Sequence, residues 1–222
     1  MAIIVGTGGV QFSDSTVQTT KFDSTMDSGD LLNITSYTTA GTFTWTKPTG
    51  ANRVLVKVVG GGGGGAGYCE SGGAGGYSEK KIDVSAVSTV TVTVGGGGAG
   101  VTYWAVASTG GTSSFGTYCT ATGGYGSSYN SQHSGGIGGV GSGGDVNLYG
   151  GAGTGHANSS GHYVGGVGGT SHFGGSSTVS RPSVNVRTDD SAWGSGGPGA
   201  RTNDGNIGNA GMNGAVVVYA YK

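Results

Sequence analysis

The chain has little proline, little charge and almost no cysteine. Among its 222 residues, 3 are proline, 2 are cysteine and 9% are charged. The scarcity of proline excludes collagen, which combines glycine at every third position with abundant proline. Cys69 and Cys119 are too few and too far apart for a disulfide-stabilised scaffold. We expect them to be two thiols, with a single bridge between them as the alternative.

Runs of one charge sign and long apolar stretches are also missing. The formal net charge is −1, and no cluster of Lys or Arg offers a surface to a phosphate backbone. No apolar stretch approaches the roughly 20 residues that span a bilayer, and residues 1–5 (MAIIV) lack the basic start of an export signal. We therefore expect neither a nucleic-acid partner nor insertion into a membrane.

Helical periodicity is absent too. Glycine occupies 54 positions, each costs about 1 kcal/mol inside a helix, and no apolar pattern repeats every 3.6 residues. Gly60, Gly62 and Gly65 follow a strand with the spacing of the dinucleotide-binding fingerprint, but that site needs a helix directly after the glycines. We therefore expect no cofactor.

What the chain does contain is strands that run into glycine. Residues 54–59 (VLVKVV) lead into the glycines 60–65, and residues 89–94 (TVTVTV) lead into the glycines 95–98. Alternation of apolar and polar residues is typical of a half-buried strand. Further strands are predicted at residues 42–46, 76–84, 112–115, 118–122 and 215–221, the last apolar on both faces and hence a central strand.

The alternation also predicts the core. Phe43 or Trp45 should cover an edge of it, and the turn at residues 47–50 (KPTG) should close a hairpin between 42–46 and 53–59. The side chains expected to face inward are those of Val54, Val56, Val58, Val90, Val92, Val94, Val216 and Val218.

Between residues 123 and 214, glycine pairs recur with a period of three, as in residues 135–140 (GGIGGV) and 165–170 (GGVGGT). Three residues per turn is the polyproline II repeat. With glycine on two of three edges, such helices can approach closely and bond backbone to backbone. We expect ordered layers in which the larger third residue fills the space between helices; the alternative is a flexible glycine linker.

These patterns predict an all-β fold: a β-sandwich of short antiparallel strands with glycine-rich loops and polyglycine II-like layers, and essentially no α-helix. Residues 1–33 read as an N-terminal attachment segment and linker, too polar to fold alone. Residues 34–222 form the glycine-rich β domain, with a strand-rich part (34–122), a Gly-Gly-X part (123–213) and a closing strand (214–222).

Patterns for catalysis or metal binding are weak. The histidines His133, His156, His162 and His172 match no familiar ligand spacing. Asp189 and Asp190 are the only adjacent pair of carboxylates, and no nucleophile-elbow motif is present. We therefore expect that the protein is not an enzyme and that it holds no metal.

The interruptions between glycine runs are rich in residues suited to contact. Aromatic rings with polar tips give contact area at low entropic cost, and Ser, Gly and Asn adapt their hydrogen bonds. The alternative is that these are ordinary turns. The predicted contact residues are Tyr125, Tyr129, His133, Tyr149, His156, His162, Tyr163, Arg187 and Trp193.

Residues 10–20 (VQFSDSTVQTT) resemble the FSDGTVQTT segments of bacteriophage tail-fibre and tail-tip proteins, although Ser15 stands where the family has glycine. Residues 41–67, 76–100, 110–115 and 214–221 are similar to the glycine-rich domain at the ends of such fibres.

This resemblance implies a virion protein, made in the host cytoplasm, that binds a glycan or an outer-membrane protein on the host surface through the predicted contact residues. It also implies a homotrimer, joined to other tail or fibre subunits through residues 1–33. No catalytic residue of the family maps onto the chain. The alternative is a purely structural virion component: a fibre shaft, a baseplate part or a capsid decoration protein.

Overall fold

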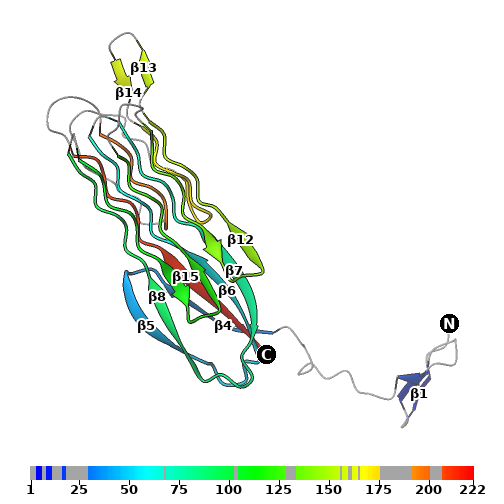
Figure 1. Cartoon of the computed structure of the whole chain (residues 1–222). Coiled ribbons are helices and arrows are strands. Elements are labelled where there is room, and N and C mark those ends of the chain that lie inside the picture. The colour runs from blue at the N-terminus through cyan, green and yellow to red at the C-terminus, as the bar shows by residue number, and fades with distance from the viewer. Residues whose placement is uncertain are drawn as a thin grey trace.

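The computed structural model describes residues 30–67, 69–102, 105–128, 134–155, 166–175, 192–200 and 207–222. It also gives the backbone of β1 (Ile4–Gly6), β2 (Gly9–Gln11), β3 (Val17–Gln18), β13 (Ala157–Ser159) and β14 (His162–Val164). The body of the molecule is elongated, with sheets at one end and extended glycine-rich chains that continue from them (Figure 1). In these residues no helix long and apolar enough to cross a membrane occurs.

Two five-stranded antiparallel sheets form a β-sandwich, as predicted. The first contains β5 (Gly41–Thr46), β8 (Thr89–Val94), β9 (Ser113–Phe115), β10 (Cys119–Ala121) and β11 (Gly141–Ser142). The second contains β4 (Leu31–Tyr37), β6 (Arg53–Val59), β7 (Tyr77–Asp83), β12 (Val146–Leu148) and β15 (Ala215–Tyr221). Their strand orders are β11-β10-β9-β8-β5 and β12-β7-β6-β15-β4, and β1, β2 and β3 make a separate three-stranded sheet.

The predicted valines do form the core between the two sheets. Trp45 joins them at 1% exposure, with its ring edge-on to Phe115 at 5.6 Å between centroids. Phe43 is only partly buried and packs beside Tyr37 at the margin of the core. The buried valines are Val54, Val56 and Val58 of β6, Val90, Val92 and Val94 of β8, and Val216 and Val218 of β15.

The turn at residues 47–50 does not close the predicted hairpin. β5 pairs with β8, whereas β6 pairs with β7 on one side and β15 on the other. Because both edges of β6 are occupied, the turn carries the chain from one sheet to the other. β15 lies between β6 and β4, which confirms it as an interior strand. β4 begins at Leu31, so residues 31–33 of the predicted linker belong to the second sheet.

The glycine runs extend the strands into a bundle of parallel and antiparallel chains. Its central chain is residues 60–67, and every third N–H of this chain donates to the same neighbour. Residues 60 and 63 donate to 76 and 73, residues 61 and 64 to 111 and 108, and residues 62 and 65 to 212 and 209, with N···O distances of 2.8–3.0 Å. Backbone N–H groups that point in the same direction at every third residue are characteristic of a polyproline II helix, which has three residues per turn.

Carbonyl groups of the central chain accept hydrogen bonds from three further chains with the same period of three residues. Residues 61 and 64 accept from 124 and 127, residues 62 and 65 from 98 and 101, and residues 63 and 66 from 197 and 200. Residues 60–67 are therefore surrounded by six neighbours. Residues 71–76 form a second inner chain. Its backbone is hydrogen-bonded to the central chain and to the segments around 122–125, 136–139, 151–154 and 194–197, and the carbonyl of Gly72 also accepts a hydrogen bond from the N–H of Gly169.

The two inner chains contain only Gly, Ala and Ser. A Cβ added to Gly62 would overlap the carbonyl oxygen of Ser195, and one added to Gly63 would overlap that of Tyr125. Neighbouring backbones thus approach to a distance that only glycine permits. This confirms the polyglycine II-like packing predicted from the period of three.

Larger residues of the Gly-Gly-X repeats lie on the outside of the bundle, which corrects the prediction that they fill it. Ile137 is 62% exposed and Val140 is 39% exposed, whereas Gly136 and Gly139 are buried. Backbone-to-backbone hydrogen bonding leaves no space for a side chain between helices. The third residue must therefore point to solvent.

Adjacent residues of one repeat give a matched test of this packing. A Cβ at Gly136 would overlap the carbonyl oxygen of Tyr125, while the side chain of Ile137 is in solvent. We expect Gly136→Val to lower the melting temperature strongly or to prevent folding, and Ile137→Val to melt like the parent. Thermal unfolding followed by circular dichroism measures both; equal melting of the two variants would contradict the packing.

A second test addresses the sandwich core. Val56 is fully buried between the sheets, so Val56→Ala leaves a cavity and should cost about 1–3 kcal/mol of unfolding free energy. Thr91→Ala, at an exposed position of β8, is the control and should cost clearly less. Denaturant titration gives both values, and a Val56→Ala variant as stable as the control would refute the core assignment.

Candidate functional site

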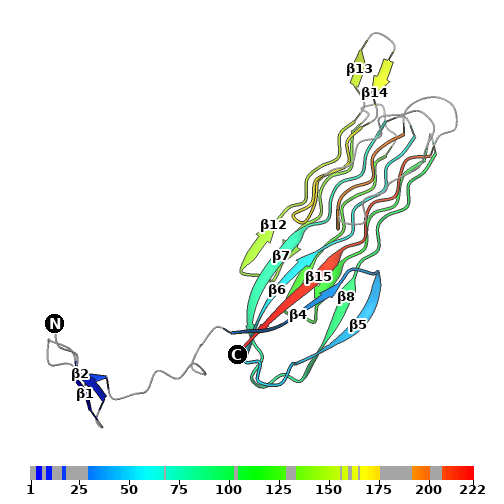
Figure 2. The same ribbon diagram turned by 180° about the vertical axis from the view of Figure 1, so that it is seen from behind.

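The two ends of the body differ in what they carry. At the sandwich end, the backbone N–H of Lys222 donates to the carbonyl of Asp30 at 3.1 Å. Asp30 and Lys222 thus lie side by side at the sandwich end of the body. At the other end, the antiparallel hairpin of β13 and β14 projects beyond the glycine bundle, as both views show (Figures 1 and 2).

Other chain segments also meet at this far end. Isolated bridges join Ala66 to Val101, Gly67 to Ala200 and Val106 to Ser128. These residues flank the stretches 103–104, 129–133 and 201–206, which lie outside the described residues. The described residues Val101, Val106, Ser128 and Ala200 therefore lie together at the far end of the bundle.

The structure separates the predicted contact residues into different regions. Tyr129, His133, His156 and Arg187 lie outside the described residues. His162 and Tyr163 belong to β14, in the far-end hairpin. The described residue Ser128, next to Tyr129 in the sequence, is bridged to Val106 at the same end.

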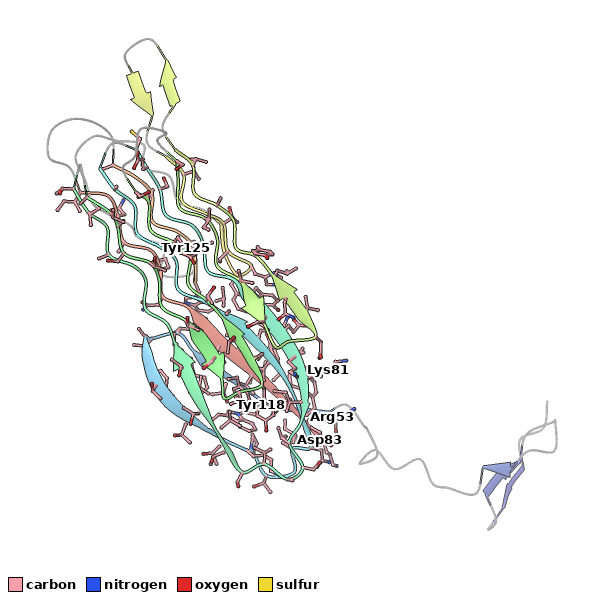
Figure 3. All side chains as sticks on the ribbon, in the orientation of Figure 1. Arg53, Lys81, Asp83, Tyr118 and Tyr125 are labelled. Atoms are coloured by element: carbon pink, nitrogen blue, oxygen red, sulfur yellow. The ribbon has the colours of Figure 1, made fainter. Side chains whose placement is uncertain are left out.

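The remaining predicted residues lie elsewhere. Tyr125 is on the side of the bundle (Figure 3), 52% exposed, and its carbonyl accepts a hydrogen bond from the N–H of Gly73. Tyr149 is 78% exposed and bridges to Val140 where the bundle joins the sandwich. Trp193 also lies at this junction. These three side chains do not form one site with the far-end hairpin.

Trp193 belongs to an aromatic cluster on the second sheet. Its ring is edge-on to Phe173 at 6.2 Å, and Phe173 is edge-on to Tyr77 at 5.8 Å. His172 stacks on Tyr77 with 3.7 Å between ring centroids. The hydroxyl of Ser171 donates to the carbonyl of Trp193. No sequence pattern predicts this cluster, because its members come from three separate segments.

Tyr77 anchors the cluster to β7. Its hydroxyl donates to the Glu79 carboxylate at 2.6 Å. Burial, and then this hydrogen bond and the charge of Glu79, raise the pKa of Tyr77 far above its usual value. Glu79 in turn lies 3.6 Å from the ammonium of Lys57, which sits 5.7 Å from the centre of the Tyr219 ring.

The two sheets present different outer faces. On the first, one row of hydroxyl side chains crosses all five strands, through Thr42, Thr93, Ser114, Thr120 and Ser142. All the outward positions of its strands are Thr or Ser. The outward positions of β6, β7 and β15 that are exposed or half-buried instead carry Arg53, Leu55, Lys57, Glu79, Lys81, Asp83, Tyr219 and Tyr221, and buried Val59, Tyr77, Ala215 and Val217 alternate onto the same face.

A pocket of about 540 Å³ opens on this second outer face. Figure 3 shows Arg53, Lys81 and Asp83 along the same side of the sandwich. Hydrogen bonds from the hydroxyl and the backbone N–H of Ser85, together with the charge of Lys47, lower the pKa of Asp83, so its carboxylate is ionised at neutral pH. The pocket is lined by Arg53, Val54, Leu55, Lys81, Ile82, Asp83 and Tyr221.

Cys69 and Cys119 are both buried and are not joined to each other, as expected. Cys119 lies in β10, where burial raises the pKa of its thiol to about 11. Cys69 lies in the bundle with a φ of 71°. Among the residues with described placement, no three His, Cys, Asp or Glu side chains are grouped so as to hold a metal ion.

A sandwich whose strands continue into a polyglycine II bundle defines the structural class. The chain belongs to the family described as Glycine-rich domain, whose profile matches residues 38–221. That match begins directly after β4, runs to the end of β15 and includes every chain of the bundle. A comparison with curated proteins finds no match.

Burial of the Cys119 thiol predicts slow reaction with thiol reagents in the folded protein. The thiolate is the reactive form, and with a pKa of about 11 roughly one molecule in a thousand carries it at pH 8. In a Cys69→Gly variant, which isolates Cys119 and suits the positive φ, we expect very slow reaction with a disulfide reagent at pH 8. Unfolding should restore fast reaction, and equally fast reaction of the folded variant would contradict the burial.

Proposed function

We propose that this protein is a bacteriophage tail-fibre or tail-tip protein that binds a receptor on the host-cell surface during adsorption, without catalysing a reaction. The receptor is a surface glycan or an outer-membrane protein. The resemblance of residues 10–20 to tail-fibre segments supports this proposal. Membership of the glycine-rich domain family is consistent with it.

The observation that carries the proposal is the separation of the two ends of the body. The backbone bond between Lys222 and Asp30 keeps entry and exit of the chain together at the sandwich. The β13–β14 hairpin, with His162 and Tyr163, is at the opposite end. A fibre needs this arrangement, because one end must face the particle and the other must face the cell.

The glycine bundle suits the role of a rigid spacer. At a rise of about 3.1 Å per residue, residues 60–67 span roughly 25 Å. Each of these residues donates a backbone hydrogen bond to a neighbouring chain. Segments supported on such a base lose less conformational entropy when they bind a receptor.

Assembly and location follow from the same proposal. Residues 1–33 would join the protein to other tail or fibre subunits, since they precede or begin the sandwich at the end away from the hairpin. The proposed state is a homotrimer in the virion, made in the host cytoplasm.

One observation favours a second candidate, a purely structural virion component. β4 is an edge strand without charged residues, and its Leu31, Leu32 and Ile34 are 48%, 40% and 52% exposed. Exposed apolar edge strands promote pairing with other chains. In a fibre shaft, baseplate part or capsid decoration protein, such an edge would pack against another subunit.

Adsorption separates the two candidates. We expect particles with Tyr129→Ala, His133→Ala and Tyr163→Ala together to lose adsorption to host cells, because Tyr163 belongs to β14 of the far-end hairpin and Ser128, next to Tyr129 in the sequence, is bridged to Val106 at the same end. Tyr125→Ala with Tyr149→Ala is the matched control: both residues are exposed, but away from that end, and adsorption should persist. Unchanged melting of the purified chains checks the fold. Undiminished adsorption of the far-end variant would favour the structural candidate.

A further inference from the structure

The sandwich has two flanks, and only one of them is protected against pairing with another chain. At the flank of β11 and β12 the edge strands have two and three residues, and the loop between them, residues 143–145, bonds to β7. The N–H of Asp145 donates to the carbonyl of Glu79, and the Asp145 carboxylate accepts from the N–H of Lys81. Short, charged and covered edges protect a sheet from edge-to-edge pairing.

The opposite flank has none of these features. Its edge strands are β4 in the second sheet and β5 in the first, with seven and six residues. Residues 31–46, which contain both strands and the turn between them, include no charged side chain and no proline. Within the described residues, no backbone hydrogen bond reaches the free side of either strand, and β1, β2 and β3 form a sheet of their own. Two long edges are therefore open to another chain.

Alternate residues of each edge strand direct their N–H and C=O groups away from the sheet. On β5, the N–H of Lys47 donates to the carbonyl of Ser88, which continues the ladder with β8. The odd-numbered residues of β5 therefore bond β8, and the even-numbered ones present their backbone groups on the free side. These are Thr42, Thr44 and Thr46.

β4 also presents the backbone groups of even-numbered residues. In the second sheet, the N–H of Val84 donates to the carbonyl of Asn52, so even-numbered residues of β6 bond β7 and odd-numbered ones bond β15. By the register of the sheet, even-numbered residues of β15 then bond odd-numbered residues of β4. Ile34 and Ser36 are left with their N–H and C=O groups on the free side.

β4 and β5 run in opposite directions along the body. β6 and β8 lead into the glycine bundle, so they run toward the far end (Figure 1). β15 and β5 pair antiparallel with them and run the other way, whereas β4 pairs antiparallel with β15 and runs toward the far end. Copies that all point the same way can therefore pair β4 of one with β5 of the next as antiparallel strands. Antiparallel pairing of β4 with β4 would instead turn two far ends in opposite directions.

Lengths and faces of the two strands match in one register. Placing Ile34 opposite Thr44 of the next copy aligns residues 32–37 with all six residues of β5. The free backbone groups then meet. Both side chains lie on the outer faces of their sheets, so the outer faces continue into one another. Ile34, which is 52% exposed in the single chain, would pack against Thr44 across the strands.

β4 and β5 belong to the same flank, where Tyr37 packs beside Phe43 with 5.4 Å between ring centroids. A contact between two different strands of one flank can close into a ring about an axis along the body, whereas edges on opposite flanks would extend into an open row. In the ring, the half-buried side chains of Tyr37 and Phe43 would lie next to the axis.

We propose that β4 of one copy pairs with β5 of the next around a threefold axis along the body, so that each second sheet continues into the first sheet of a neighbour. This interface rests on the homotrimer of the proposed function and assigns the surface that forms it. Asp30, where the attachment segment meets the sandwich, is then at one end in all three copies, and the far-end hairpin is at the other.

Light scattering of the purified full chain measures the number of copies. Three chains of 21.5 kDa give about 65 kDa. Ile34→Lys and Thr44→Lys each place a charge in the middle of the contact, one on either strand, and each should convert the trimer to a monomer. Val146→Lys, at a 44% exposed position of the opposite edge strand β12, is the matched control and should stay trimeric. Unchanged circular dichroism checks the fold.

Two results of this measurement would overturn the pairing. A monomeric parent chain would show that the open edges do not meet. A trimer that Thr44→Lys leaves intact, or that Val146→Lys disrupts equally, would place the contact elsewhere.

Cysteine pairs test the register without weakening the contact. In the proposed pairing, Ser36 lies opposite Thr42 of the next copy with Cα atoms about 5.5 Å apart, which is within reach of a disulfide. Within one chain the same two side chains are on the outer faces of different sheets and cannot meet. Oxidised Ser36→Cys with Thr42→Cys should give three-chain products on a denaturing gel. Products limited to two chains, or none beyond those of the single variants, would contradict the ring.

Assembly and receptor binding can fail separately. A monomeric chain whose far-end variant loses adsorption would remove this interface and keep the proposed receptor contact. A trimeric chain whose far-end variant adsorbs normally would keep the interface and favour the structural candidate.

Discussion

Hydrogen bonds between glycine backbones are the interaction on which this structure depends. The central chain, residues 60–67, donates to three neighbours and accepts from three others. A backbone hydrogen bond contributes only about 1 kcal/mol net, but a buried peptide group without one costs more. Close approach of the chains is therefore possible only if every one is in register with its neighbours. Glycine is required because a Cβ at Gly62 or Gly63 would overlap a neighbouring carbonyl group.

The sandwich supplies the hydrophobic core that the bundle lacks. The inner chains of the bundle bury no large apolar side chain, whereas the sandwich buries Trp45, Phe115 and the valines of β6, β8 and β15. Each inner chain continues a strand of the core: residues 60–67 follow β6 directly, and residues 71–76 lead directly into β7. The hydrophobic core thus fixes the register from which the hydrogen bonds of the bundle propagate.

This construction restricts where binding residues can be. Inside the bundle no side chain larger than those of Ala and Ser fits in the two inner chains. Reactive or recognising groups are therefore confined to the outer chains, the far end and the outer faces of the sandwich. The far-end hairpin and the face that carries Arg53, Lys81 and Tyr221 are two such places. They lie at opposite ends of the elongated body.

By itself the sequence determines the strands, the inward valines and the period of three, because alternation and glycine spacing are local patterns that act through local backbone geometry. It does not determine that β6 pairs with β7 and β15 instead of β5, because that pairing depends on strands that are distant in the sequence. Nor does it determine that Ile137 points outward, because this depends on how closely the neighbouring chains of the bundle pack. The pocket is likewise decided by the tertiary structure alone. Arg53, Lys81 and Tyr221 come from three distant segments, and only the pairing of β6 with β7 and β15 places them side by side.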